Sequence, residues 1–171
     1  MVRQVQALFC LNNQRAVDHG PSAYCQARLR LPLDSLQRIR HAVAARAERF
    51  LPEVQPLWHG LRPKVIDGST LTLPDTPKNQ RAYPQSRSQK PGWGFPLLKI
   101  VGIFSLSSGG LLDYAKGNKQ QHELSLLRKL LDHFKPGDLV IADRGFSNFV
   151  LMAGLLLRGA GSLFRLHQAR R

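Results

Sequence analysis

The sequence has few cysteines, few acidic residues and no long uninterrupted apolar run. Its two cysteines, Cys10 and Cys25, form neither a CxxC pair nor a zinc-ligand spacing, which argues against a disulfide-rich or zinc-finger scaffold. The most apolar stretch, 149–166, is divided by Gly154 and Arg158 and is too short for a transmembrane helix. The first residues also lack the apolar core of a secretion signal. We therefore expect a cytoplasmic protein with no membrane partner.

Two motifs of phosphate and acyl chemistry are absent as well. The sequence contains no GxxxxGK[ST] phosphate loop and no GxSxG nucleophile elbow. The glycine-rich segment 107–110 lies between two predicted strands, so a hairpin turn explains it better than a phosphate cradle.

Positive charge is what the sequence has in excess. It contains 25 Lys and Arg against 11 Asp and Glu, for a net charge of +14. With 171 residues and 43% hydrophobic composition, the chain can bury a core of its own. A basic, Arg-rich chain favours phosphate-rich partners, so nucleic acid is the first candidate and an anionic membrane surface the second.

The apolar pattern changes its period along the chain. A spacing of three and four residues predicts an amphipathic helix over 33–50 that ends at Pro52, with an Arg-rich face that either is solvated or contacts phosphate. After residue 60 the pattern becomes mixed, which predicts an α/β fold with a mixed sheet following a small helical region, 1–60. The expected strands are 64–71, 97–106, 110–115, 138–142 and 161–166, and the expected helices are 120–134 and 147–157.

A polar segment, 74–96, separates the first two predicted strands. Pro, Gln, Ser and Gly dominate it, and basic side chains alternate with Tyr83 and Trp93. Loops of this length are often functional, and basic with aromatic residues suit contact with a nucleic-acid strand; an ordinary surface loop is the alternative. The candidate nucleic-acid contacts are Lys78, Arg81, Arg87 and Lys90, together with Arg144 farther along the chain.

Two aspartates are the candidate metal ligands. Asp67 follows the apolar pair Val65-Ile66, and Asp143 follows the apolar run 139–142. Carboxylates at the ends of neighbouring strands can share a hard divalent cation, although either one alone is also typical of a turn or cap. Asp138, in a Pro-Gly-Asp sequence, is interpreted as a turn residue.

Four segments resemble the DDE transposases of bacterial insertion sequences, of the insertion-sequence-four type. They are Ile-Asp-Gly-Ser-Thr at 66–70, Pro-Asp-Thr-Pro-Lys-Asn at 74–79, His-Glu-Leu at 122–124, and Gly-Asp-Leu-Val-Ile-Ala-Asp-Arg-Gly-Phe at 137–146. The resemblance implies a ribonuclease-H-like catalytic domain over 61–171, with Asp67 and Asp143 as its first two metal-binding acids. It also implies Mg²⁺, with Mn²⁺ as a substitute, and DNA cleavage and strand transfer at transposon ends.

The same resemblance calls for a third acid, a Glu on a later helix. No acidic residue follows Asp143, so we expect a fold incomplete at its C-terminus and a shortened copy that is inactive alone. The implied partners are transposon-end and target DNA, with self-association in a synaptic complex, in a bacterial cytoplasm at the nucleoid. Two alternatives remain open at this point. One is a non-catalytic DNA-binding fragment that interferes with an intact transposase. The other is a haloacid-dehalogenase-like phosphatase, but that chemistry requires a second acid two positions from Asp67, and this sequence has none at position 65 or 69.

Overall fold

The computed structural model describes residues 7, 9–12, 21–54 and 58–165. Contacts group residues 1–39 into one compact unit and residues 40–171 into another. Helix α2 (Pro21–Arg30) lies in the first unit, and α3 (Leu33–Val54) begins there. The helix predicted over 33–50 is present, but it continues past Pro52 to Val54. The rest of the predicted helical region, 1–6, 8, 13–20 and 55–57, lies outside the described residues.

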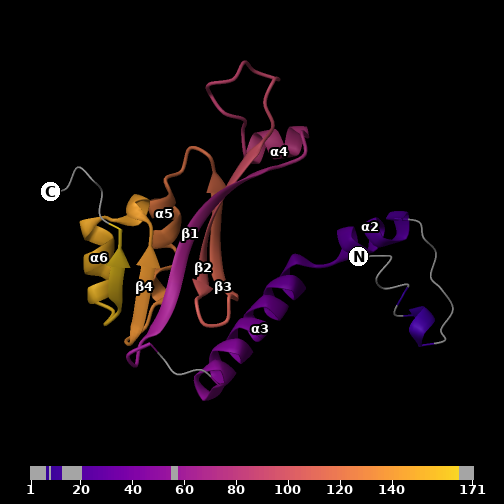
Figure 1. The fold of residues 1–171 in the computed structure, drawn as a ribbon. Coiled ribbons are helices and arrows are strands. Elements are labelled where there is room, and N and C mark those ends of the chain that lie inside the picture. Colours follow the sequence, from indigo (N-terminus) through magenta and orange to yellow (C-terminus); the bar gives the residue numbers. More distant parts are fainter. Residues whose placement is uncertain (1–6, 8, 13–20, 55–57, 166–171) are drawn as a thin grey trace. The chain divides into compact units, whose positions relative to one another are not determined.

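A five-stranded mixed sheet forms the centre of the second unit (Figure 1). Its strands are β1 (Arg62–Thr72), β2 (Leu97–Ser105), β3 (Leu111–Asn118), β4 (Asp138–Ala142) and β5 (Gly161–Phe164). They lie in the order β3-β2-β1-β4-β5, where β1, β2 and β3 pair antiparallel and β4 pairs parallel with both β1 and β5. The expected α/β class with a mixed sheet flanked by helices is confirmed.

Two helices connect the strands across one face of the sheet. Helix α5 (Glu123–Arg128) joins β3 to β4 and α6 (Phe149–Leu156) joins β4 to β5, and right-handed crossovers in the same direction place both helices on the same face. Leu126 and Leu127 of α5 and Leu155 of α6 share one buried cluster with Ile66 and Val140 of the sheet. The hydrophobic core therefore lies between this face and the helices.

The helix predicted over 120–134 is much shorter in the structure. Strand β3 continues to Asn118, which pairs with Leu98, and Asn118 and Gln121 bind nearby backbone N–H groups in the turn that follows. The helix consequently begins at Glu123, and a separate 3₁₀ turn at Leu131–His133 replaces its second half.

The opposite face of the sheet carries side chains that alternate with the core positions. Val65, Tyr114 and Ile141 are half-buried there, and Asp67 and Leu163 are exposed. Because successive strand residues point to opposite faces, Asp67 points away from the face that α5 and α6 cover.

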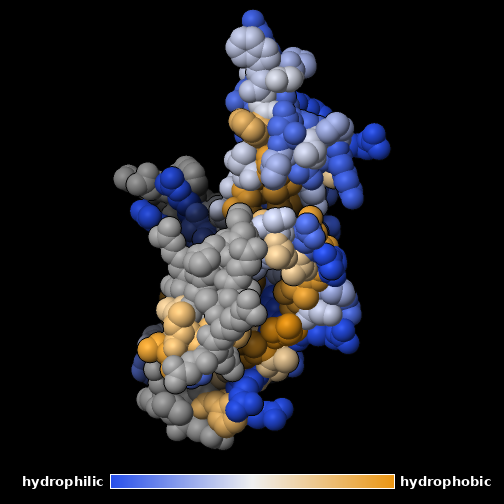
Figure 2. All heavy atoms as spheres, turned by 90° about the vertical axis from the view of Figure 1, so that its right-hand side faces the viewer, coloured by the Kyte–Doolittle hydropathy of each residue, from blue (hydrophilic) through white to orange (hydrophobic). Residues whose placement is uncertain are grey.

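Strands β1 and β2 continue their pairing beyond the end of β4 and carry a projection (Figure 1). The polar segment 74–96 forms this projection, and it contains helix α4 (Pro77–Ala82), which the sequence analysis did not predict. Thr76 caps α4 by accepting a hydrogen bond from the Asn79 N–H at 3.2 Å, and Pro77 occupies the first turn. Figure 2 shows mostly hydrophilic side chains at the outer end of the projection.

No described helix is long and apolar enough to cross a bilayer.

Candidate functional site

The aspartate of the first motif lies within β1, and not at its end as predicted. Asp67 is exposed, and its Oδ1 accepts a hydrogen bond from the Gly68 N–H at 2.8 Å. Strand β1 continues for five further residues to Thr72, because it keeps pairing with β2 after its pairing with β4 has stopped. Asp67 therefore marks the point where β4 ends beside β1.

The second aspartate directly follows β4. Asp143 is exposed and is the N-cap of the 3₁₀ turn Arg144–Phe146, where its Oδ1 accepts from the Gly145 N–H at 2.8 Å. A Cβ atom at position 145 would lie 3.1 Å from that oxygen, so glycine lets the chain turn closely around the carboxylate. The turn fixes the orientation of Asp143, as a cap does.

Register places the two aspartates side by side. The last pair of the parallel β1–β4 ladder is Ile66 with Ala142, and Asp67 and Asp143 are the next residues of the two strands. Both members of that last pair are buried toward the helices, so the following residues point to the opposite face. Each carboxylate has one oxygen held by a glycine N–H, and its Oδ2 receives no hydrogen bond from a described residue. Both aspartates therefore lie at the C-terminal end of β4, each with one carboxylate oxygen held in place.

A third acidic ligand is not found beside them. In the part of the chain that the structure describes, no group of three His, Cys, Asp or Glu could hold a metal ion. The nearby Glu123 packs its carboxylate on the helix-bearing side of β1. A Cβ atom on Gly68 would lie 2.9 Å from its Cδ. Glu123 consequently fills the space that glycine leaves, on the other side of the strand from the Asp67 side chain.

The predicted nucleic-acid contacts occupy the projection and the turn after β4. Lys78 and Arg81 lie on α4, Arg87 and Lys90 lie on the loop 84–95, and Arg144 follows Asp143; all five side chains are exposed. Between α4 and the loop lies a hollow of about 810 Å³. The structure therefore brings four of these cations together on the projection and places the fifth next to the paired aspartates.

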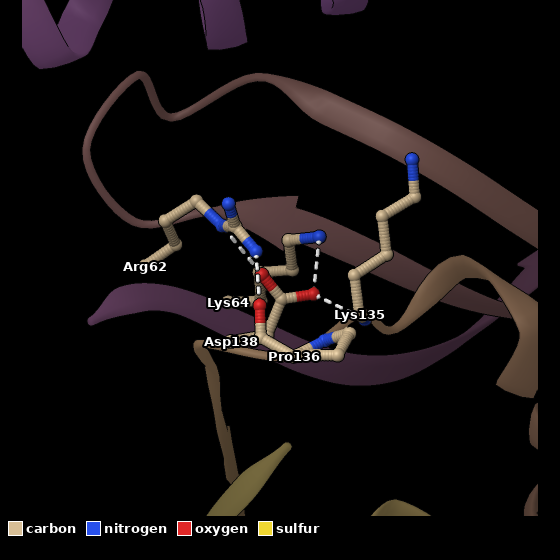
Figure 3. Close-up of polar contacts among 5 residues, drawn as sticks. All are labelled: Arg62, Lys64, Lys135, Pro136 and Asp138. Atoms are coloured by element: carbon tan, nitrogen blue, oxygen red, sulfur yellow. Dashed lines mark hydrogen bonds and ion pairs between the residues drawn. The ribbon is translucent and has the colours of Figure 1, made fainter. Parts of the chain in front are cut away.

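At the other end of the β1–β4 pair lies a buried ionic cluster that the sequence analysis missed (Figure 3). Asp138 closes the predicted turn, because its N–H donates to the Lys135 carbonyl at 3.1 Å, but it is also the first residue of β4 and its side chain is fully buried. Its Oδ1 accepts from Arg62 Nε at 2.8 Å, and its Oδ2 accepts from Lys64 Nζ and the Lys135 N–H, each at 2.8 Å. Arg62 also donates to the Pro136 carbonyl at 2.6 Å. Burial alone raises the pKa of Asp138, but the hydrogen bonds from Lys64, Lys135 and Arg62 outweigh it, so this pKa lies below its ordinary value.

The same cluster affects a neighbouring histidine. Burial lowers the pKa of His133 below 6.5, and the positive charge of Lys64 lowers it further. His133 is therefore neutral at pH 7, and it adds no charge to the cluster around Asp138.

Most of the chain is similar to proteins of one known class. Residues 58–169 match the family model described as Transposase DDE domain. The chain is 31% identical over 141 residues to "Transposase InsG for insertion sequence element IS4" of Escherichia coli (strain K12), a match that covers 82% of this chain and 31% of that protein. Among solved structures, it is similar to the piggyBac transposase synaptic complex with hairpin DNA, with a TM-score of 0.40, 11% identity, and coverage of 64% of this chain and 24% of that chain.

Proposed function

The chain belongs to the transposase DDE domain family, of the type found in insertion sequence IS4, and from this premise we propose that Asp67 and Asp143 bind divalent metal ions for DNA cleavage and strand transfer. The observation that carries the proposal is the register of β1 and β4. Asp67 and Asp143 are the residues that follow its last pair, Ile66 with Ala142, although 76 positions (143 minus 67) separate them in the sequence.

The donor set fits a hard cation. Mg²⁺ takes one or two carboxylates, water and phosphate oxygens, and Mn²⁺ accepts the same ligands. The chemistry that such ions supply is activation of a water or a 3′-hydroxyl and stabilisation of the leaving oxygen. The contribution of this chain is to hold the two carboxylates in fixed orientations and to place Arg144 beside them.

Two carboxylates are fewer than the family resemblance implies. Two-metal catalysis holds its ions about 3.5–4 Å apart around the scissile phosphate, which requires more ligands than Asp67 and Asp143 provide. No acidic residue follows Asp143 in the 171 residues. We therefore infer that this polypeptide alone holds one ion loosely and cuts DNA slowly. DNA binding without cleavage is the second candidate function, favoured by the same lack of a third acid among the described residues.

Metal binding tests the site without requiring catalysis. We expect Mn²⁺ to bind weakly to the chain and to broaden NMR signals around residues 67 and 143, because paramagnetic broadening reports proximity to the ion. Asp67→Asn or Asp143→Asn should abolish this local broadening. Asp75→Asn is the matched control, since Asp75 is an exposed carboxylate on the projection and accepts from Gln80. Broadening that survives both site variants, or that is lost equally in the control, would refute the assignment.

DNA binding should depend strongly on salt. We expect affinity for duplex DNA to fall steeply between 50 and 200 mM salt, because each neutralised phosphate releases counterions. Lys78→Ala, Arg81→Ala, Arg87→Ala and Lys90→Ala should each reduce the slope of log K against log salt by about 1. Fluorescence anisotropy over a salt series measures the slope. Lys116→Ala, an exposed cation on β3, serves as the control and should leave the slope unchanged. A flat salt response in the parent chain would contradict DNA binding through this surface.

A further inference from the structure

An exposed indole lies in the loop 84–95 of the projection. Trp93 is 80% exposed, and the ammonium of Lys90 lies 5.8 Å from the centroid of its ring. A cation at this distance attracts the ring but leaves its other face open. The loop thus displays a flat aromatic surface with a positive charge beside it.

The loop is built around one glutamine. Gln85 Oε1 accepts from the N–H groups of Gly92 at 3.1 Å and Gly94 at 3.2 Å. Its Nε2 donates to the carbonyls of Gln89 at 3.2 Å and Lys90 at 2.8 Å. These four bonds hold the backbone on both sides of Trp93, so a single amide side chain fixes the backbone that carries the indole.

A second glutamine and two glycines complete this framework. Gln80 donates to the Gly94 carbonyl at 2.9 Å and accepts from the Gln85 N–H at 3.1 Å, which ties the loop to α4. Gly92 has a φ of +80°, and a Cβ atom on Gly94 would lie 3.0 Å from the Gln85 Cβ. The conformation around Trp93 therefore requires these residues. A loop ordered before it binds loses little conformational entropy on binding.

The charges around the indole suit a polyanion. Lys78, Arg81, Arg87 and Lys90 are exposed on the same projection, and Lys119 reaches it by a hydrogen bond of 3.4 Å to Ser86. Among described residues 74–96, the only acid is Asp75, which accepts from Gln80. Phosphates can pair with these cations while a base covers the indole.

We propose that Trp93 is a stacking platform for an unpaired base of a DNA strand, and that Gln85 is its positioning residue. In a paired duplex each base face is covered by its neighbours, so a flat side chain finds an open face only at a strand end or in an unpaired segment. Basic residues beside a stacking ring are typical of single-strand binding surfaces. This inference rests on the proposed function, because it assigns a DNA structure to the same protein.

The length of β1 indicates how far this platform lies from the paired aspartates. From Asp67 to the end of β1 at Thr72 is five residues, or about 17 Å of extended strand, and the loop begins beyond that point. A stacked DNA strand rises about 3.4 Å per nucleotide. The unpaired base should consequently lie at least about five nucleotides from a phosphate held at Asp67.

Fluorescence can test the platform directly. The chain has two tryptophans, so Trp58→Phe leaves Trp93 as the only emitter. In this background we expect a duplex with a ten-nucleotide single-stranded extension to quench the emission and to bind more tightly than the blunt duplex. Trp93→Ala should lower affinity for the extended DNA about 5- to 150-fold, the range for loss of one stacked base, and change affinity for the blunt duplex by less than twofold. Trp93→Phe should retain part of the preference.

Gln85→Ala tests the positioning role. It should remove the preference for the extended DNA as Trp93→Ala does, while the thermal unfolding midpoint stays that of the parent chain. If Trp93→Ala weakens both DNAs equally, or neither, the stacking proposal is wrong although DNA binding stands. If the parent chain binds neither DNA, the proposed function fails and the stacking proposal fails with it.

Discussion

Replacement of Asp138 by alanine is expected to lower the free energy of unfolding by about 3–5 kcal/mol. The substitution leaves Lys64, whose side chain is 6% exposed, without its carboxylate partner. An unpaired buried charge is far more costly than the pair, because the desolvation of the ammonium is no longer compensated. Since domains are stable by only about 5–15 kcal/mol, the loss should be obvious in urea unfolding followed by circular dichroism.

Two further variants separate this effect from a general loss of charge. Asp132→Ala removes a carboxylate that pairs with Arg158 at 2.7 Å but is 94% exposed. The free energy of unfolding of this variant should therefore differ little from that of the parent chain. The double variant Lys64→Met with Asp138→Asn should recover part of the loss, because the unpaired ammonium is gone. A loss in Asp132→Ala as large as that in Asp138→Ala would contradict the role of burial.

The pH dependence has a defined sign. The pKa of Asp138 is lowered in the folded chain, so its contribution is fully present above the ordinary carboxyl pKa of about 3.9 and is lost as the pH falls through the lower, folded value. The part of the stability difference between the parent chain and Asp138→Ala that comes from the titration of Asp138 itself should therefore be constant from pH 5 to 7. It should narrow only below about pH 3.9.

The second large effect concerns cleavage. Asp67→Ala and Asp143→Ala are each expected to lower the rate at which this chain cleaves transposon-end DNA with Mn²⁺ by at least about a thousandfold. Loss of about 4 kcal/mol of charge stabilisation by a metal ion corresponds to this factor. Nicking of end-labelled DNA, followed over hours at saturating Mn²⁺, measures the rate.

Controls for this experiment come from neighbouring carboxylates. Asp75→Ala should cut at the parental rate, because Asp75 lies on the projection. Glu123→Ala should retain cleavage as well, since its carboxylate packs against Gly68 on the helix-bearing side of β1. Cleavage that survives Asp143→Ala would show that the metal site is elsewhere, and loss of cleavage in Glu123→Ala would show that it includes a carboxylate we have excluded.

The strands were the most predictable part of the fold. The run 138–142 matches β4 at both ends, because Pro-Gly before it and Asp-Arg-Gly after it interrupt the backbone pattern. The helix over 120–134 was wrong in extent, since pairing of Asn118 with Leu98 is a tertiary contact that local periodicity does not contain. The short helix α4 was missed although Thr76 followed by Pro77 is a typical helix start.

The site was predictable in its residues more than in its arrangement. Asp67 and Asp143 were chosen because each follows a buried apolar run, but only the sheet order places β1 beside β4. The ion pairs of Asp138 were missed because its partners, Arg62 and Lys64, lie 76 and 74 positions away (138 minus 62 and 64), and a local Pro-Gly-Asp pattern gives no indication of them. Whether the aspartates bind metal stays a prediction.

The spacing of charged residues along β1 and β4 determines where the chain can tolerate insertions and deletions. Five positions separate Arg62 from Asp67, and five separate Asp138 from Asp143. An odd spacing along an extended segment puts the two side chains on opposite faces, so Arg62 and Asp138 point toward the helices and Asp67 and Asp143 point away from them. A one-residue insertion or deletion within either interval would make the spacing even and turn an aspartate toward the core. Natural variants should therefore keep both intervals at five, whereas residues 84–95 can differ in number without moving either carboxylate.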